Sequence, residues 1–175
     1  KATELLNRIH YVSTATVTMA YRKNGFSHPL NGFGFVVPKE EECNILACTW
    51  TSSKFPLRAP EDFVLIRCYI GGALQEELAE RDAESIISLV ENDLKKIMGI
   101  RQKAVFCRVY ANHKANVQYH VGHQTLIGEI QKELKNFPGL HLSGSAYTGI
   151  GLPDCIQNGT REAEAALARL AASIK

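Results

Sequence analysis

Hydrophobic residues in the first half of the chain fall in short runs that are typical of β-strands. The run at 11–21 is rich in Val, Thr and Tyr and partly alternates apolar with polar positions before the turn-like residues 22–25 (RKNG). Similar runs occupy 32–38, 44–52 and 62–71, separated by charged or proline-containing segments. Because short connections favour antiparallel pairing, these runs predict an antiparallel sheet.

The pattern then changes to helical spacing. Asp82 is a good N-cap residue and Gly99 a good C-cap residue, so we expect an amphipathic helix over 83–98. Residues 103–110 return to strand character. The predicted helix places four apolar residues along one face: Ile86, Val90, Leu94 and Ile97.

The last third of the chain predicts a helix, a short strand, a glycine-rich turn and a final helix. The first helix is expected at about 125–136, where a Pro-Gly pair follows it. The strand is expected at 140–142 and the turn at 144–151. Pro153 suits the first turn of the final helix, which we expect to continue to Ile174. Its apolar stripe comprises Ile156, Ala163, Leu167, Leu170 and Ile174.

Composition narrows the class of protein. The 175 residues are 45% hydrophobic, which is ordinary for a globular domain. Because 20 Lys and Arg stand against 18 Asp and Glu, the formal net charge is only +2, and no block of one sign stands out. This balance disfavours a role in nucleic-acid binding.

The expected compartment follows from what the sequence lacks. No run approaches the roughly 18–20 apolar residues that span a bilayer, and the first residues lack the apolar stretch of a secretory signal. Five cysteines without a C-x-x-C pair favour reduced, mostly buried thiols. We therefore expect a soluble, cytoplasmic protein.

The glycine-rich turn before the final helix is the strongest candidate for a ligand site. The first N–H groups of a helix lack partners within the helix, and the helix dipole attracts electronegative atoms there. The spacing Gly149-x-Gly151-x-x-Asp154 lacks the third glycine of the dinucleotide fingerprint, so this is not a Rossmann phosphate loop. The spacing alone leaves both a structural turn and a ligand site open.

Other candidate residues carry weaker signals. His120 and His123 could pair on a metal, but a turn separates them and no Cys or carboxylate lies close in sequence, so we expect no metal site. Trp50 is the single tryptophan and fits either the core or a pocket wall. No serine lies in a G-x-S-x-G context, which leaves nucleophilic hydrolysis without support.

Several blocks, taken in order along nearly the whole chain, resemble one enzyme family. They are residues 28–38 (HPLNGFGFVVP), 48–60 (CTWTSSKFPLRAP), 70–73 (IGGA), 118–123 (QYHVGH) and 144–155 (GSAYTGIGLPDC). In this order they resemble the oxygen-dependent protoporphyrinogen oxidases, which are flavoproteins of the amine-oxidase type.

The resemblance implies an α+β fold with a mostly antiparallel or mixed sheet and packed helices. Residues 1–138 would belong mostly to a substrate-binding domain, and 139–175 would form the strand, glycine turn and helix that complete an FAD-binding domain. Members of the family are much longer, and their N-terminal dinucleotide-binding motif has no counterpart here. We therefore expect the chain to be a C-terminal portion whose partner is the missing N-terminal part.

The resemblance also implies FAD as cofactor and two sets of site residues. The cofactor set is Gly144, Gly149, Ile150, Gly151, Leu152 and Asn112. The substrate set is Leu30, Phe33, Trp50 and Asn116, of which Asn116 stands where a pocket aliphatic is usual. Because the flavin carries the redox chemistry, we expect no catalytic acid, base or nucleophile in this chain.

The implied activity is FAD-dependent oxidation of protoporphyrinogen IX to protoporphyrin IX by dioxygen, in haem synthesis. One alternative is another amine-oxidase-type flavoprotein, such as a carotenoid desaturase. A second is a non-catalytic module that binds a tetrapyrrole without FAD. Relatives often associate peripherally with membranes, so the resemblance keeps that association open for this protein.

Overall fold

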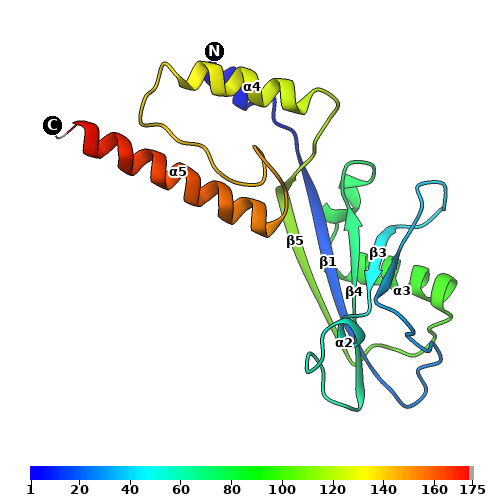
Figure 1. Cartoon of the computed structure of the whole chain (residues 1–175). Helices are drawn as coiled ribbons and strands as arrows, with labels where there is room; N and C mark the ends of the chain where they lie inside the picture. The colour runs from blue at the N-terminus through cyan, green and yellow to red at the C-terminus, as the bar shows by residue number, and fades with distance from the viewer. Residues whose placement is uncertain (174–175) are drawn as a thin grey trace. The chain divides into compact units, whose positions relative to one another are not determined.

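The computed structural model describes residues 1–173, which divide into two compact units (Figure 1). The sheet unit runs from Val12 to Asn116. The helical unit combines Lys1–Tyr11 with the chain from Val117 onward. Each unit has its own hydrophobic core.

Within residues 1–173, five strands form one sheet in the order β2-β3-β4-β1-β5. β1 pairs antiparallel with β4, β4 with β3, and β3 with β2. The antiparallel sheet predicted from the sequence is therefore confirmed. The strands are β1 (Tyr11–Arg22), β2 (Gly34–Val36), β3 (Ile45–Thr49), β4 (Phe63–Gly71) and β5 (Phe106–Val117).

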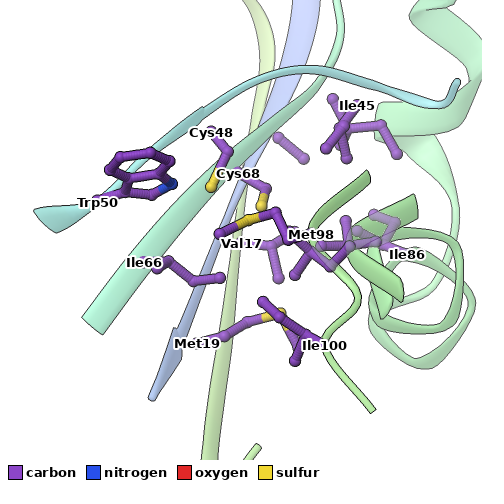
Figure 2. Packing of buried hydrophobic residues seen from close by; sticks show 14 of the residues in the cluster. Val17, Met19, Ile45, Cys48, Trp50, Ile66, Cys68, Ile86, Met98 and Ile100 are labelled. Atoms are coloured by element: carbon purple, nitrogen blue, oxygen red, sulfur yellow. The ribbon is translucent and has the colours of Figure 1, made fainter. Parts of the chain in front are cut away.

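The core of the sheet unit lies on one face of the central strands. On β1 and β4, Val17 lies opposite Cys68 and Met19 opposite Ile66, and all four side chains are fully buried. They share one face because successive side chains of a strand point to opposite sides. Helix α3 (Ala83–Met98) adds Ile86, Val90, Leu94 and Met98 to the same cluster (Figure 2). Ile97, which was predicted on the same face, is instead 40% exposed.

Helix α3 begins and ends where the sequence predicts. The Asp82 carboxylate accepts the Ser85 N–H at 2.9 Å, which satisfies one of the free donors of the first turn. Gly99 closes the helix with a left-handed φ of 69°.

Asp93 fixes α3 against the sheet. This residue is buried, and its Oδ2 accepts the backbone N–H of Asn44 at 2.6 Å and of Ile45 at 2.9 Å. Because a buried carboxylate is costly unless it is hydrogen-bonded, these contacts determine where the helix meets the start of β3. Nothing in the apolar spacing of the helix predicts this contact.

The helical unit contains α1 (Ala2–Leu6), α4 (His123–Leu134) and α5 (Leu152–Ser173). The core joins Leu5 of α1 to Ile127 and Ile130 of α4. Most of α5 is exposed. The predicted end of the final helix at Ile174 lies outside the described residues.

One predicted strand is wrong. Residues 140–142 are irregular, and no strand within residues 1–173 pairs with them. A strand needs a neighbouring backbone to satisfy its N–H and C=O groups. Here the Leu140 N–H instead donates to the Phe137 carbonyl at 3.0 Å, which closes a turn.

Several elements begin or end at other residues than the sequence predicts. The run predicted as a strand at 44–52 ends at Thr49, and α2 (Thr51–Lys54) follows it. The strand predicted at 103–110 is β5, which begins later and continues to Val117. The sequence did not predict its second half, because the exposed polar residues there hide the apolar–polar alternation. The short elements α1 and η1 (Glu76–Glu80) carry no clear sequence signal and were not predicted.

Candidate functional site

The glycine-rich turn enters α5 through backbone conformations that favour glycine. Gly144 has φ of +125° and Gly149 has φ of +114°, values that L side chains rarely adopt. A Cβ on Gly149 would lie 2.7 Å from the Cβ of Asp154, so a larger residue does not fit there. Gly151 has an ordinary φ, but a Cβ on it would lie 3.1 Å from Oδ2 of Asp154.

One polar side chain of α5 holds this turn by a hydrogen bond and a second lies beside it, and the sequence predicted neither arrangement. Asn158 is buried and donates from Nδ2 to the Thr148 carbonyl at 2.9 Å. Asp154 lies in the first turn of α5, beside Gly149 and Gly151. Asn158 lies among other polar residues of the helix, and only its buried position reveals its role.

The surface of the turn is open. Ile150 is 63% exposed and Leu152 is 80% exposed, although both are apolar. A Cβ added to Gly144 would meet nothing within 4 Å. Ile150 and Leu152 are therefore not covered by side chains of the described helical unit, although Ala146 in the same turn is buried in its core.

These features fit an electron-rich, planar group. The start of a 22-residue helix offers N–H donors and a partial positive charge, and exposed apolar side chains stand beside it. The Asp154 carboxylate is stabilised at the same helix end, and its negative charge lies beside Gly149 and Gly151. A ligand that accepts hydrogen bonds from the amides would therefore have to approach from the side away from Asp154.

The predicted substrate residues Leu30, Phe33 and Trp50 differ in their surroundings. Trp50 is only 8% exposed and belongs to the core cluster of the sheet unit, where Figure 2 shows its indole ring. Its ring centre lies 5.0 Å from that of His28. Phe33 is mostly exposed, and Leu30 is half-buried with a left-handed φ of +50°.

A cavity of about 590 Å³ lies beside Leu30. Its apolar walls include Leu57 and Phe63, and Lys23 and His28 also line it. Leu57 is fully exposed and has a φ of +66°. Leu30 and Leu57, two apolar residues of the cavity wall, thus both adopt an uncommon backbone conformation. Leu30 is the predicted substrate residue that lines this cavity.

Asn112 and Asn116 both lie on β5 and are exposed. Asn116 donates from Nδ2 to the Thr14 hydroxyl at 2.6 Å on the neighbouring strand. The structure thus brings the five predicted turn residues together in the helical unit. The other five predicted site residues lie in the sheet unit.

The candidate metal pair does not form a metal site. His123 is buried and its Nε2 lies 2.9 Å from the Ala146 carbonyl, while the His120 ring lies 5.0 Å from that of His10. Within residues 1–173 no three His, Cys, Asp or Glu side chains gather as metal ligands would. His123 is thus a satisfied core histidine that helps to position the turn.

A polar cluster joins β1, η1 and β5. The Glu76 carboxylate lies 2.6 Å from the Lys114 ammonium and accepts the Ser13 N–H at 2.7 Å, and these contacts lower the pKa of Glu76 to about 2. Nδ1 of His113 lies 3.3 Å from both the Ser13 hydroxyl and the Glu80 carboxylate. A catalytic triad uses opposite nitrogens of the imidazole for these two contacts, so the cluster is structural.

The chain matches one protein family along nearly its whole length. The family model described as "Flavin containing amine oxidoreductase" matches residues 1–167. The chain belongs to this family. A flavin is therefore the cofactor class of its relatives, and the open turn of α5 has the donors that such a group needs.

Several named proteins are similar in sequence to this chain. The chain is 36% identical to coproporphyrinogen III oxidase of Bacillus subtilis, over 94% of this chain and 35% of that protein. It is 28% identical to mitochondrial protoporphyrinogen oxidase of Nicotiana tabacum, over 93% of this chain and 33% of that protein. The chain thus spans about a third of the length of these relatives.

One solved structure is similar to this chain over nearly its whole length. A crystal structure assigned to protoporphyrinogen oxidase from Exiguobacterium sp. 255-15 superposes with a TM-score of 0.82 at 30% identity, covering 96% of this chain and 37% of that one. Reduced UDP-galactopyranose mutase shares the fold alone, with a TM-score of 0.61 at 14% identity. No helix within residues 1–173 has the length and apolar character needed to cross a membrane.

Proposed function

We propose that this chain is the C-terminal part of an FAD-dependent porphyrinogen oxidase, which converts a porphyrinogen to the porphyrin with dioxygen in haem synthesis. One observation carries the proposal: the chain aligns over 94% of its length with a protein named coproporphyrinogen III oxidase. The remainder of the enzyme would be its partner and would supply the dinucleotide-binding motif.

On this proposal, the turn of α5 holds the flavin ring. The backbone N–H groups at Ile150, Gly151 and Leu152 would donate to the electron-rich edge of the ring, and Gly144 and Gly149 would leave room for it. A bound flavin supplies hydride acceptance, and reduction places negative charge on that edge. Donors fixed by the helix stabilise such charge without moving water.

The sheet unit would bind the tetrapyrrole. A flat, mostly apolar substrate gains most of its binding free energy from burial, at roughly 25 cal/mol per Å² of apolar surface. Leu30, which lines the cavity, and the exposed Phe33 ring offer such surface. Trp50 lies in the core, with its ring 5.0 Å from the His28 ring of the cavity wall. Asn112 and Asn116 stay candidate cofactor and substrate contacts on β5.

Protoporphyrinogen IX is the substrate that the sequence resemblance implies. Coproporphyrinogen III is a second candidate, because the chain is 36% identical to two bacterial proteins of that name and 28% identical to the mitochondrial protoporphyrinogen oxidase. We also propose that the enzyme is cytoplasmic and associates peripherally with membranes.

The test is turnover by the purified complete gene product. Each porphyrinogen is supplied in air, and the fluorescence of the porphyrin product is followed with added FAD. Formation of porphyrin well above the rate of spontaneous oxidation supports the proposal. Oxidation of a carotenoid precursor instead would identify a desaturase, and porphyrin binding without flavin or turnover would identify a non-catalytic binding module.

A further inference from the structure

The cavity beside Leu30 has a polar side that the proposed function does not yet use. It combines apolar walls with two groups that can donate to an anion, Lys23 and His28. Its volume of about 590 Å³ is typical of small-molecule sites. Small-molecule sites are mostly apolar, with a few polar groups that orient the ligand. This cavity is more polar than that, because polar and apolar surface line it in about equal measure.

His28 is fixed on two sides. Its Nδ1 accepts the Leu30 N–H at 3.1 Å, and its ring lies 5.0 Å from the Trp50 ring. Because Nδ1 accepts a hydrogen bond, the neutral ring carries its proton on Nε2. That Nε2–H has no protein acceptor among the hydrogen bonds of residues 1–173, so it remains a donor for a ligand.

Lys23 is anchored through its backbone. Its N–H donates to the Asp62 carbonyl at 2.8 Å, and its carbonyl accepts the Phe26 N–H at 3.0 Å. Glu61 is the acidic residue that lines the same cavity. No ion pair joins the Lys23 ammonium to Glu61 within the described residues, so Glu61 does not neutralise its charge by direct contact.

We propose that this cavity binds a propionate of the tetrapyrrole, with the carboxylate held by Nε2–H of His28 and the ammonium of Lys23. The inference rests on the proposed function and names specificity-determining residues for it. Leu30, Leu57 and Phe63 would contact the apolar edge of the pyrrole that carries this propionate. Glu61 disfavours an anion, so the two donors must outweigh it.

The test uses the complete, flavin-loaded gene product and two separate variants. His28→Phe keeps a ring against Trp50 but removes the Nε2–H donor together with the Nδ1 acceptor of the Leu30 N–H, so any displacement of Leu30 must be measured with a ligand that lacks the carboxylate. Lys23→Met keeps the aliphatic stem but removes the charge. Each loses one charge-assisted hydrogen bond, so the Kd for coproporphyrin III, measured by fluorescence titration, should rise about tenfold. The KM for coproporphyrinogen III should rise in parallel while kcat is kept. Lys39→Met, on the exposed loop between β2 and β3, is the matched control and should change neither value.

The methyl ester of coproporphyrin III separates carboxylate recognition from packing. It lacks the anion, so it should bind to the wild type and to both variants with the same Kd. An unchanged Kd for coproporphyrin III in both variants would overturn the inference, as would an equal loss of affinity for the ester. If the wild type neither binds nor oxidises any tetrapyrrole, the proposed function itself fails. If the wild type is active and both variants bind coproporphyrin III as tightly as it does, only the propionate site is refuted.

Discussion

Substituting Gly149 by alanine should weaken flavin binding without unfolding the protein. The φ of +114° at this position lies outside the regions that alanine adopts easily. The added Cβ would also lie 2.7 Å from the Cβ of Asp154, which is fixed to the backbone of α5 and cannot rotate away. Strain of this kind costs about 1–3 kcal/mol, so the turn should relax and displace the amides that follow. That cost corresponds to an increase of about 5- to 150-fold in the Kd for FAD.

The assay is a titration of the apoprotein, prepared from the complete gene product, with FAD, followed by flavin fluorescence. Gly159→Ala is the matched control, because this glycine lies inside α5, where a Cβ would meet only Ser143 Oγ at an ordinary 3.7 Å. It should leave the Kd unchanged and raise the free energy of unfolding by about 0.5–1 kcal/mol. A folded Gly149→Ala protein whose Kd for FAD stays within twofold of the wild type would refute the assignment of the turn as a flavin site.

Three further predictions concern the sheet unit. Gly34→Ala should lower the free energy of unfolding by about 3 kcal/mol in urea titrations, because its Cβ would overlap the Cys48 carbonyl oxygen; an unchanged midpoint would contradict the packing. Asp93→Ala should cost about 3 kcal/mol in the same assay, since the buried Ile45 N–H and the part-buried Asn44 N–H lose their acceptor, and a loss below about 1 kcal/mol would count against that role. The contacts with Lys114 and Ser13 lower the pKa of Glu76 from 4.5 to about 2, so its contribution is present above pH 4.5 and is lost as the pH falls toward 2. Glu76→Gln should therefore flatten the acid limb of the Tm profile, and a parallel profile would refute this.

The sheet and α3 could be predicted because local signals and tertiary packing agree there. The apolar residues of β1 and β4 alternate, and Asp82 and Gly99 mark both ends of α3 with capping geometry that the structure reproduces. Residues 140–142 were mispredicted because strand-like residues form a strand only beside a partner strand. The buried Asp93 could not be predicted, because its partners lie 48 and 49 residues away in the sequence.

The candidate site was predictable only in part. The glycines at 144 and 149 do adopt the positive φ values that make a glycine-rich turn useful. The contacts of Asp154 and Asn158 with the turn were not visible in sequence, since each residue reads as an ordinary polar position of a helix. The cavity beside Leu30 combines segments from 23–30 and 52–64, which only the folded sheet brings together. Whether the predicted residues bind flavin and substrate stays a prediction.

The most direct test of the proposal is anaerobic mixing of the flavin-loaded gene product with coproporphyrinogen III or protoporphyrinogen IX. The proposal predicts that one of them bleaches the visible flavin band. Because one flavin accepts two electrons whereas the conversion of a porphyrinogen to a porphyrin removes six, porphyrin fluorescence should rise only once dioxygen is present to reoxidise the flavin. Admission of dioxygen should then restore the band. A flavin band that persists with both porphyrinogens, or a purified protein that binds no flavin, would contradict the central claim.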